Sequence, residues 1–179
     1  MLHYREMVDG DLDAVAAIFA HHVTTGVATF ETVPPTVDDW RRKLADVNGR
    51  GLPFLVADDG AEVVGLAYAS PWRPKPAYDH TVEDTIYLAP GHTGRGIGAG
   101  LLGELLARCA DAKMRQVIAV IADTGSDASA ALHRKFGFTQ VGRLIGVGHK
   151  HDRWIDTILM QRDLAAWNAD SLATGLGAR

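Results

Sequence analysis

The sequence has one cysteine, few aromatic residues and no surplus of positive charge. Cys109 is the single cysteine among 179 residues, so an internal disulfide is impossible and no oxidising compartment is implied. Its apolar surroundings favour a buried structural thiol over a nucleophile. The formal net charge of −4 gives no basic surface of the kind that binds nucleic acid.

Long hydrophobic runs are also absent. No stretch approaches the roughly 20 apolar residues that a membrane-spanning helix needs. Residues 1–20 lack the basic start, apolar run and cleavage site of a secretory signal. The sequence therefore predicts a soluble cytoplasmic protein with neither a nucleic-acid nor a membrane partner. It also predicts no metal site, because its eight histidines include no His-Glu-x-x-His and no cysteine pair accompanies them.

The length and the composition, 47% hydrophobic and 22% charged, fit one globular domain. We expect this domain over residues 1–164 and a loose polar tail over 165–179. Apolar periodicity predicts strands at 2–8, 54–57, 63–69, 81–88, 117–122, 139–147 and 154–160, and helices at 12–23, 36–44, 97–113 and 127–136. This order favours a mixed α/β layer structure over a regular βαβ series.

Local signals set several of these boundaries. Asp11 is suited to cap the first helix, and Thr36 with Asp39 resembles a capping box for the second. Gly137 suits the end of the last helix. The triplet Asp58-Asp59-Gly60 predicts a hairpin turn between two strands.

The most informative segment is the glycine-rich loop Gly91–Gly100, which lies between an expected strand and an expected helix. Five glycines in ten residues let the backbone turn tightly and bring its N–H groups close to a ligand. The start of the following helix adds unpaired donors and a positive dipole end. Together these features predict a phosphate cradle, to which Arg95 adds a charged contact.

Two other phosphate loops have to be compared with this one. A P-loop requires Gly-Lys-Ser or Gly-Lys-Thr, and neither is present. A dinucleotide-binding fingerprint fits better, because Gly94-x-Gly96-x-x-Ala99 has its spacing and Asp123 follows the next strand. Only about 80 residues remain after the loop, too few for a second βαβ series. An NAD-dependent dehydrogenase stays open as an alternative.

With this loop and the motifs below, the sequence resembles the GCN5-related N-acetyltransferase (GNAT) superfamily, and within it the phosphinothricin and methionine sulfoximine N-acetyltransferases. The acetyl-CoA loop of the superfamily, Gln/Arg-x-x-Gly-x-Gly/Ala, corresponds to residues 93–98. The narrower family is indicated by Ala28-Thr29-Phe30-Glu31, Ala77-Tyr78, Thr81-Val82-Glu83, Ala128-Ser129, Leu132-His133, Gly137-Phe138, Val141-Gly142, Val147-Gly148-His149-Lys150 and Arg153-Trp154-Ile155-Asp156. These matches extend from about residue 3 to Leu164.

The resemblance implies the GNAT fold, a mixed and mostly antiparallel sheet of about seven strands flanked by about four helices. It also implies acetyl transfer from acetyl-CoA to the α-amine of a small amino-acid analogue, in a homodimer. Three departures accompany it. Thr93 replaces the usual Gln or Arg, Ser126 stands where many relatives have Asn, and Arg73-Pro74-Lys75 stands where relatives often have two arginines.

Two residues are candidates for the chemistry. Glu83 precedes the loop on the same strand, and a partly buried glutamate has a raised pKa that suits a general base acting directly or through water. His133 occupies the position where many acetyltransferases carry a tyrosine acid for the departing thiolate. A strand-face carboxylate and a histidine held by a backbone carbonyl are the structural alternatives.

The resemblance also assigns binding roles. The oxyanion donor is implied to be a backbone N–H near Tyr87 and Leu88, where the sheet splays. The residues expected to bind acetyl-CoA are Tyr87, Leu88, Thr93, Gly94, Arg95, Gly96, Ile97, Gly98, Ala99, Ser126 and Ser129. Those expected to bind the amine substrate are Phe30, Glu31, Arg73, Lys75, Tyr78 and Lys150. A CoA-binding module without catalysis is a further alternative.

Overall fold

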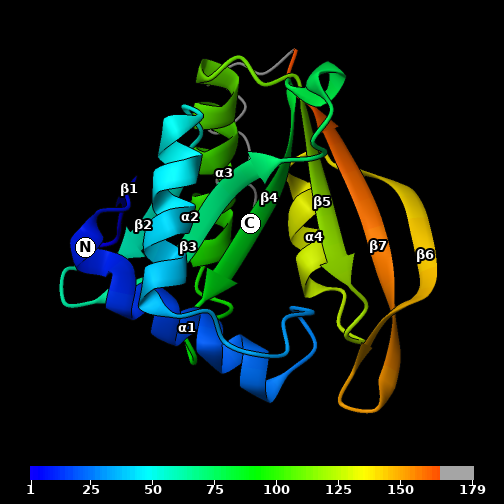
Figure 1. Ribbon diagram of the computed structural model, residues 1–179, viewed down its shortest axis with the longest axis horizontal. Helices are drawn as coiled ribbons and strands as arrows, with labels where there is room; N and C mark the ends of the chain where they lie inside the picture. Colours follow the sequence, from blue (N-terminus) through cyan, green and yellow to red (C-terminus); the bar gives the residue numbers. More distant parts are fainter. Residues whose placement is uncertain (166–179) are drawn as a thin grey trace.

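Seven strands pair side by side into one twisted sheet in the computed structural model, which describes residues 1–165 (Figure 1). The strands are β1 (His3–Glu6), β2 (Phe54–Asp58), β3 (Val63–Pro71), β4 (Thr81–Leu88), β5 (Gln116–Ala122), β6 (Thr139–Lys150) and β7 (Arg153–Asp163). Their order across the sheet is β1-β2-β3-β4-β5-β7-β6. The tail expected after residue 164 lies outside the described residues, apart from Ala165.

Four α-helices cover the two faces of this sheet. They are α1 (Leu12–Thr25), α2 (Val37–Gly49), α3 (Ile97–Asp111) and α4 (Ala128–Lys135), and two short 3-10 turns lie at Asp9–Asp11 and Pro76–Tyr78. Helices α1 and α2 lie on one face, and α3 and α4 lie on the other (Figure 1). The order and type of all eleven main elements agree with the sequence prediction, which confirms the mixed, mostly antiparallel α/β fold.

The core lies between the sheet and the helices because each helix turns one apolar stripe inward. Helix α3 supplies four leucines without exposed surface, Leu101, Leu102, Leu105 and Leu106. Cys109 continues this stripe and is also fully buried, as the sequence predicted. Strands β2 and β3 are buried on both faces, since α3 packs behind them and α1 and α2 pack in front.

One strand pair departs from the antiparallel pattern. Strands β4 and β5 run parallel, and they pair only from Thr81↔Gln116 to Asp84↔Ala119. Beyond this point β4 stays with β3 and β5 stays with β7, so the two strands diverge (Figure 1). β4-α3-β5 is the only parallel βαβ unit among residues 1–165, so the dinucleotide-binding fold is excluded there.

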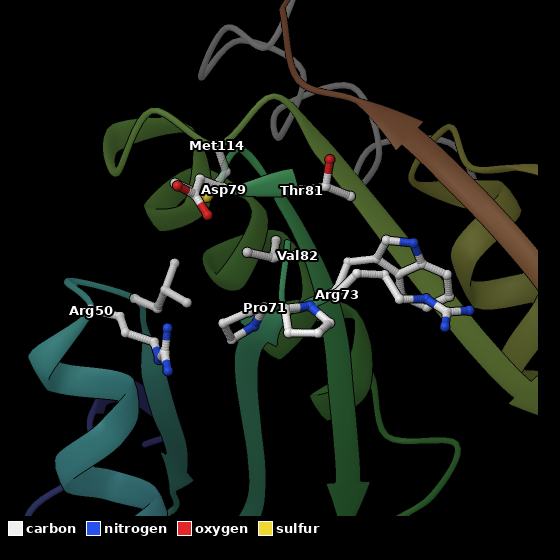
Figure 2. A pocket seen from close by; sticks show the side chains of 10 residues that line it. Arg50, Pro71, Arg73, Asp79, Thr81, Val82 and Met114 are labelled. Atoms are coloured by element: carbon white, nitrogen blue, oxygen red, sulfur yellow. The ribbon is translucent and has the colours of Figure 1, made fainter. Parts of the chain in front are cut away.

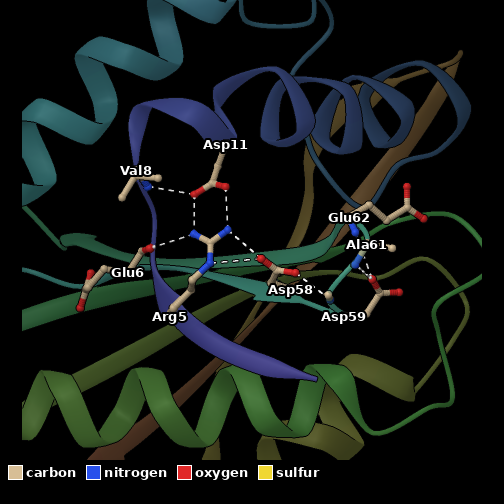
Figure 3. A network of polar contacts seen from close by, with 9 residues as sticks. Arg5, Glu6, Val8, Asp11, Asp58, Asp59, Ala61 and Glu62 are labelled. Carbon is tan, nitrogen blue, oxygen red and sulfur yellow. Dashed lines mark hydrogen bonds and ion pairs between the residues drawn. The ribbon is translucent and has the colours of Figure 1, made fainter. Parts of the chain in front are cut away.

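The capping prediction for Asp11 was wrong in its mechanism. Asp11 stands at the N-cap of α1, but its side chain makes no cap hydrogen bond there. Its carboxylate instead accepts two hydrogen bonds from Arg5, at 2.8 and 2.9 Å, and one from the N–H of Val8 (Figure 3). Arg5 also contacts Asp58, so this network ties β1, β2 and the start of α1 together. A charged partner on the neighbouring strand, six positions away, therefore overrides the capping signal.

The other local signals are confirmed, with shifted ends. Thr36 and Asp39 form the capping box of α2, and Gly137 follows α4 with a φ of +79°. The last two strands extend beyond the predicted 139–147 and 154–160. In β6 two irregularities interrupt the register, so its apolar and polar residues do not alternate in one phase along the strand. β6 therefore continues to Lys150 and forms one edge of the sheet.

Candidate active site

The divergence of β4 and β5 creates a split in the middle of the sheet. Residues Thr85–Leu88 form one side of the split, and residues 120–122 of β5 form the other. Because N–H groups alternate along a strand, some main-chain donors of residues 85–88 face the open edge without a strand partner. Tyr87 and Leu88, expected from the sequence at a splayed point, lie on this edge. An extended ligand in the split can therefore form hydrogen bonds with these main-chain groups, as a neighbouring strand would.

The glycine-rich loop lies at the open end of the split and leads directly into α3 (Figure 1). Gly94 and Gly96 adopt φ values of +73° and +79°, which side chains rarely adopt. A Cβ added at either position would meet nothing within 4 Å, so space for a ligand adjoins the backbone. Gly96 is the N-cap of α3 and no side chain caps the helix. The first N–H groups of α3 are therefore donors for an anion.

The other candidate CoA-binding residues surround this cradle. Thr93 and Arg95 are exposed, Ile97 is buried beneath the loop, and Gly98 and Ala99 lie in the first turn of α3. Ser126 and Ser129 are exposed near the start of α4, on the other side of the split. The Ser126 hydroxyl accepts a hydrogen bond from the N–H of Ala128 at 3.3 Å, so it supports the start of that helix.

Glu83 lies one residue before the last paired position of β4, opposite Ile118 of β5. Its side chain points to the face of α1 and α2, since Tyr87 on the same face packs on Phe19 of α1 with ring centroids 4.9 Å apart. The carboxylate is half-buried. Burial raises the pKa of Glu83 and the adjacent Asp84 raises it further, whereas Lys43 and Arg73 oppose this shift. A carboxylate in this state is suited to accept a proton near neutral pH.

His133 points into the molecule from α4, on the opposite face of β4. Its Nδ1 contacts the carbonyl of Ser129 at 2.7 Å, and its Nε2 contacts Asp84 at 2.9 Å. Both partners of the His133–Asp84 contact are buried. Burial lowers the pKa of His133, but the hydrogen bond and charge of Asp84 and the Ser129 carbonyl outweigh it, so the pKa is raised. Both ring nitrogens are thus engaged by the protein.

The candidate substrate residues fall into two groups. The first group lies where the α1–α2 loop meets the β6–β7 hairpin. Lys150 is 4% exposed and donates a hydrogen bond to the Thr29 carbonyl at 2.9 Å, and Phe30 packs against Gly148 of β6. Burial lowers the pKa of Lys150, and Glu31 opposes this effect. Lys150 therefore fastens the loop that carries Phe30 and Glu31 to the hairpin.

The second group lies on the β3–β4 connection, near the paired end of β4. Arg73, Lys75 and Tyr78 line a hollow of about 400 Å³ there. It adjoins a larger hollow of about 630 Å³, whose wall includes Arg50, Val82 and Met114 (Figure 2). In Figure 2 the Arg73 guanidinium points away from this larger hollow, 5.1 Å from the Trp72 ring. The larger of these two hollows therefore lies away from the split, whereas Glu83 and the glycine loop adjoin the split.

Three residues near the site were not identified from the sequence. Lys43 of α2 lies over the Tyr68 ring at 5.1 Å and influences the pKa of Glu83. The Nε2 atom of His22 in α1 contacts the Leu88 carbonyl at 2.8 Å. Asp84 engages His133. Apolar periodicity places these residues on helices or strands, but it does not tell which distant residue each one contacts.

Neither a metal centre nor a membrane segment emerges from the part of the chain that the structure describes. In residues 1–165 no three His, Cys, Asp or Glu side chains gather as potential metal ligands. None of the described helices has both the length and the apolar character that crossing a bilayer requires.

Comparison with known proteins gives a consistent result. The model of the acetyltransferase (GNAT) family matches residues 16–138. A phosphinothricin N-acetyltransferase of Alcaligenes faecalis is 49% identical over 162 residues, 90% of this chain and 82% of the relative. An L-methionine sulfoximine/L-methionine sulfone acetyltransferase of Pseudomonas aeruginosa is 35% identical over 156 residues, 86% of this chain and 90% of the relative.

A solved structure agrees with these sequence relatives. The phosphinothricin acetyltransferase of Sinorhizobium meliloti, determined in complex with AcCoA, superimposes with a TM-score of 0.87 at 42% identity. The match covers 90% of this chain and 88% of that structure. The similarity therefore extends over nearly all of the described residues, including the glycine loop and the split.

Proposed function

This chain belongs to the GNAT family of acetyltransferases and is an acetyl-CoA-dependent N-acetyltransferase, and we propose that its acceptor is the α-amine of a small amino acid of the phosphinothricin or methionine sulfoximine type. The names of the relatives support this acceptor class. The single observation that carries the proposal is the position of Glu83, half-buried beside the split that the glycine loop opens onto.

The residues around the split fit acetyl-CoA. The open space beside Gly94 and Gly96 and the uncapped start of α3 suit a pyrophosphate. Thr93 and Arg95 at the rim, and Ser126 and Ser129 across the split, are the proposed side-chain contacts. When bound, acetyl-CoA supplies the activated acyl group. The open edge near Tyr87 and Leu88 would supply a backbone donor to the acyl oxygen.

The protein's own residues contribute to the reaction by removing a proton from the substrate and by orienting it. We assign Glu83 the role of general base that removes a proton from the substrate ammonium, directly or through one water. Phe30, Glu31 and Lys150 bound the substrate space on one side, and Arg73, Lys75 and Tyr78 bound it on the other. The cations Arg73 and Lys75 are suited to a carboxylate or phosphinate.

A thiol-release assay with acetyl-CoA and a panel of amines tests this function. The panel contains phosphinothricin, methionine sulfoximine, methionine sulfone, unmodified methionine and a lysine-containing peptide. We expect the sulfoximine, sulfone or phosphinate compounds to give the highest kcat/KM. Coenzyme A binding without thiol release from any amine would favour the non-catalytic module instead.

The pH dependence of the reaction is expected to follow the charges around Glu83. Lys43 lowers the pKa of Glu83, so Lys43→Met should raise it. The acidic limb of kcat/KM against pH should then move to higher pH by about 0.3–0.5 units, the size expected for one partly screened charge. The control is Arg41→Met on the same helix, where Arg41 pairs with Asp38 at the surface. If the acidic limb of Lys43→Met stays where it is in the wild type, the ionisation that the limb reports does not belong to Glu83.

We also propose that the chain forms a homodimer through the β6–β7 hairpin. Ile145, Val147 and Trp154 are 72%, 55% and 74% exposed on it, although their side chains are large and apolar. A single charge in this patch, Ile145→Glu, should convert the dimer to a monomer in sedimentation velocity. A wild-type chain that sediments as a monomer at micromolar concentration would refute the dimer.

A further inference from the structure

The contact between His133 and Asp84 lies at the apex of the split. Asp84 is the last residue of β4 that pairs with β5, opposite Ala119. His133 belongs to α4, which packs on β5. The side-chain contact at 2.9 Å therefore joins the β5 side of the split to β4 just where the main-chain pairing ends.

The hydrogen-bond partners of His133 favour one protonation state of its ring. Nδ1 of His133 faces a carbonyl oxygen, which only accepts, so Nδ1 carries a proton. Nε2 faces a carboxylate oxygen, which accepts as well when Asp84 is ionised. With both atoms as donors the ring is an imidazolium, and the contact is a charge-assisted hydrogen bond. The direction of the His133 pKa shift agrees with this assignment.

His133 is also the only hydrogen-bond partner that the Asp84 side chain has within residues 1–165. The other carboxylate oxygen of Asp84 is buried and accepts no hydrogen bond there. The side chains of His133 and Asp84 are only 6% and 2% exposed. A buried ion whose compensation comes from one partner holds that partner firmly, because separation would leave each charge uncompensated.

We propose that Asp84 and His133 are positioning residues, which clasp β4 to α4 and thereby set the width of the split for the thioester arm of acetyl-CoA. His133 is then held by Asp84 and does not supply the proton to the departing thiolate. The inference depends on the proposed function only for the identity of the ligand in the split.

Isothermal titration with coenzyme A, together with steady-state kinetics, tests the clasp. Asp84→Asn keeps the size of the side chain and can donate an N–H to a neutral ring, so it removes the ion pair with little change of shape. We expect Asp84→Asn to weaken coenzyme A about fivefold and His133→Gln about tenfold. The kcat should fall less than about threefold, because a split of the wrong width loses contacts to the arm that are made equally in the ground state and the transition state. The KM of the amine should stay within about twofold in both variants.

Asp11→Asn serves as the matched control. It also removes an ion pair of a buried carboxylate, although its partner Arg5 is 38% exposed (Figure 3). This pair lies at the β1 edge of the sheet, separated from β4 by β2 and β3. Its melting temperature should fall like that of Asp84→Asn while its affinity for coenzyme A is retained. This control separates loss of stability from loss of positioning.

Two results would overturn the clasp. One is a fall of kcat of about fiftyfold or more in His133→Gln with unchanged affinity for coenzyme A, which would make His133 the proton donor. The other is unchanged affinity in Asp84→Asn, a result that stands even if His133→Gln does not fold. Failure of the proposed function looks different, since wild type would then bind coenzyme A and acetylate no amine.

Discussion

Glu83→Gln is expected to lower kcat at neutral pH by about a hundredfold or more, the usual contribution of a positioned general base. The dissociation constant for acetyl-CoA should change by less than about twofold, because Glu83 acts on the amine and lies on the sheet face opposite α3. Glutamine keeps the shape of the half-buried side chain, and it removes a carboxylate whose pKa burial and Asp84 already raise. The fold should therefore be retained.

The pH dependence of this variant carries further information. As pH rises, more of the substrate amine loses its proton without help, so the deficit of Glu83→Gln should shrink toward high pH. The matched control is Glu62→Gln, an exposed position in the β2–β3 turn, which should leave kcat unaltered. Normal turnover of Glu83→Gln at neutral pH would remove Glu83 from the role of base.

Gly96→Val should abolish measurable acetyl-CoA binding, and with it the activity. The φ of +79° at Gly96 is strained by about 1–3 kcal/mol for a residue with a Cβ. A valine there would also project into the open space beside the loop, where we place the pyrophosphate. Both effects act on the cradle formed by the first N–H groups of α3.

Gly60→Val controls for the strain alone. Gly60 has a φ of +94° in the β2–β3 turn, and a Cβ there also meets nothing within 4 Å. We expect the two variants to lose similar stability in thermal unfolding, but only Gly96→Val to lose the calorimetric signal of acetyl-CoA. Wild-type affinity in a folded Gly96→Val protein would contradict the assignment of the loop.

The sequence predicted the elements well because their signals are local. The apolar stripe of α3, the capping box at Thr36 and the extended run of Thr81–Leu88 each depend on residues a few positions apart. The glycine loop could be predicted equally well, because the glycines that its backbone requires lie within ten consecutive residues. These signals sufficed to predict the fold, which the structure and the related acetyltransferase structure confirm.

The pairings between distant residues could not be predicted in the same way. Asp84 and His133 are 49 positions apart, and Lys150 meets the Thr29 carbonyl across 121 positions. Asp11 was predicted to cap a helix, but its carboxylate accepts hydrogen bonds from Arg5, which is only six positions away and is brought there by the path of β1. In each case a polar group satisfies its hydrogen bonds with whatever the tertiary fold brings near, and local sequence does not specify that partner.

The burial of Cys109 makes its thiol a probe for the detachment of α3 from the sheet. Its thiol has no exposed surface, and burial raises its pKa to about 12, so the reactive thiolate is scarce in the native state. A disulfide reagent in solution will modify this chain only in molecules whose α3 has detached from the sheet. Because the sequence has no other cysteine, the labelling rate measures that detachment directly, and its slowing by coenzyme A would measure how far the ligand holds the helix in place.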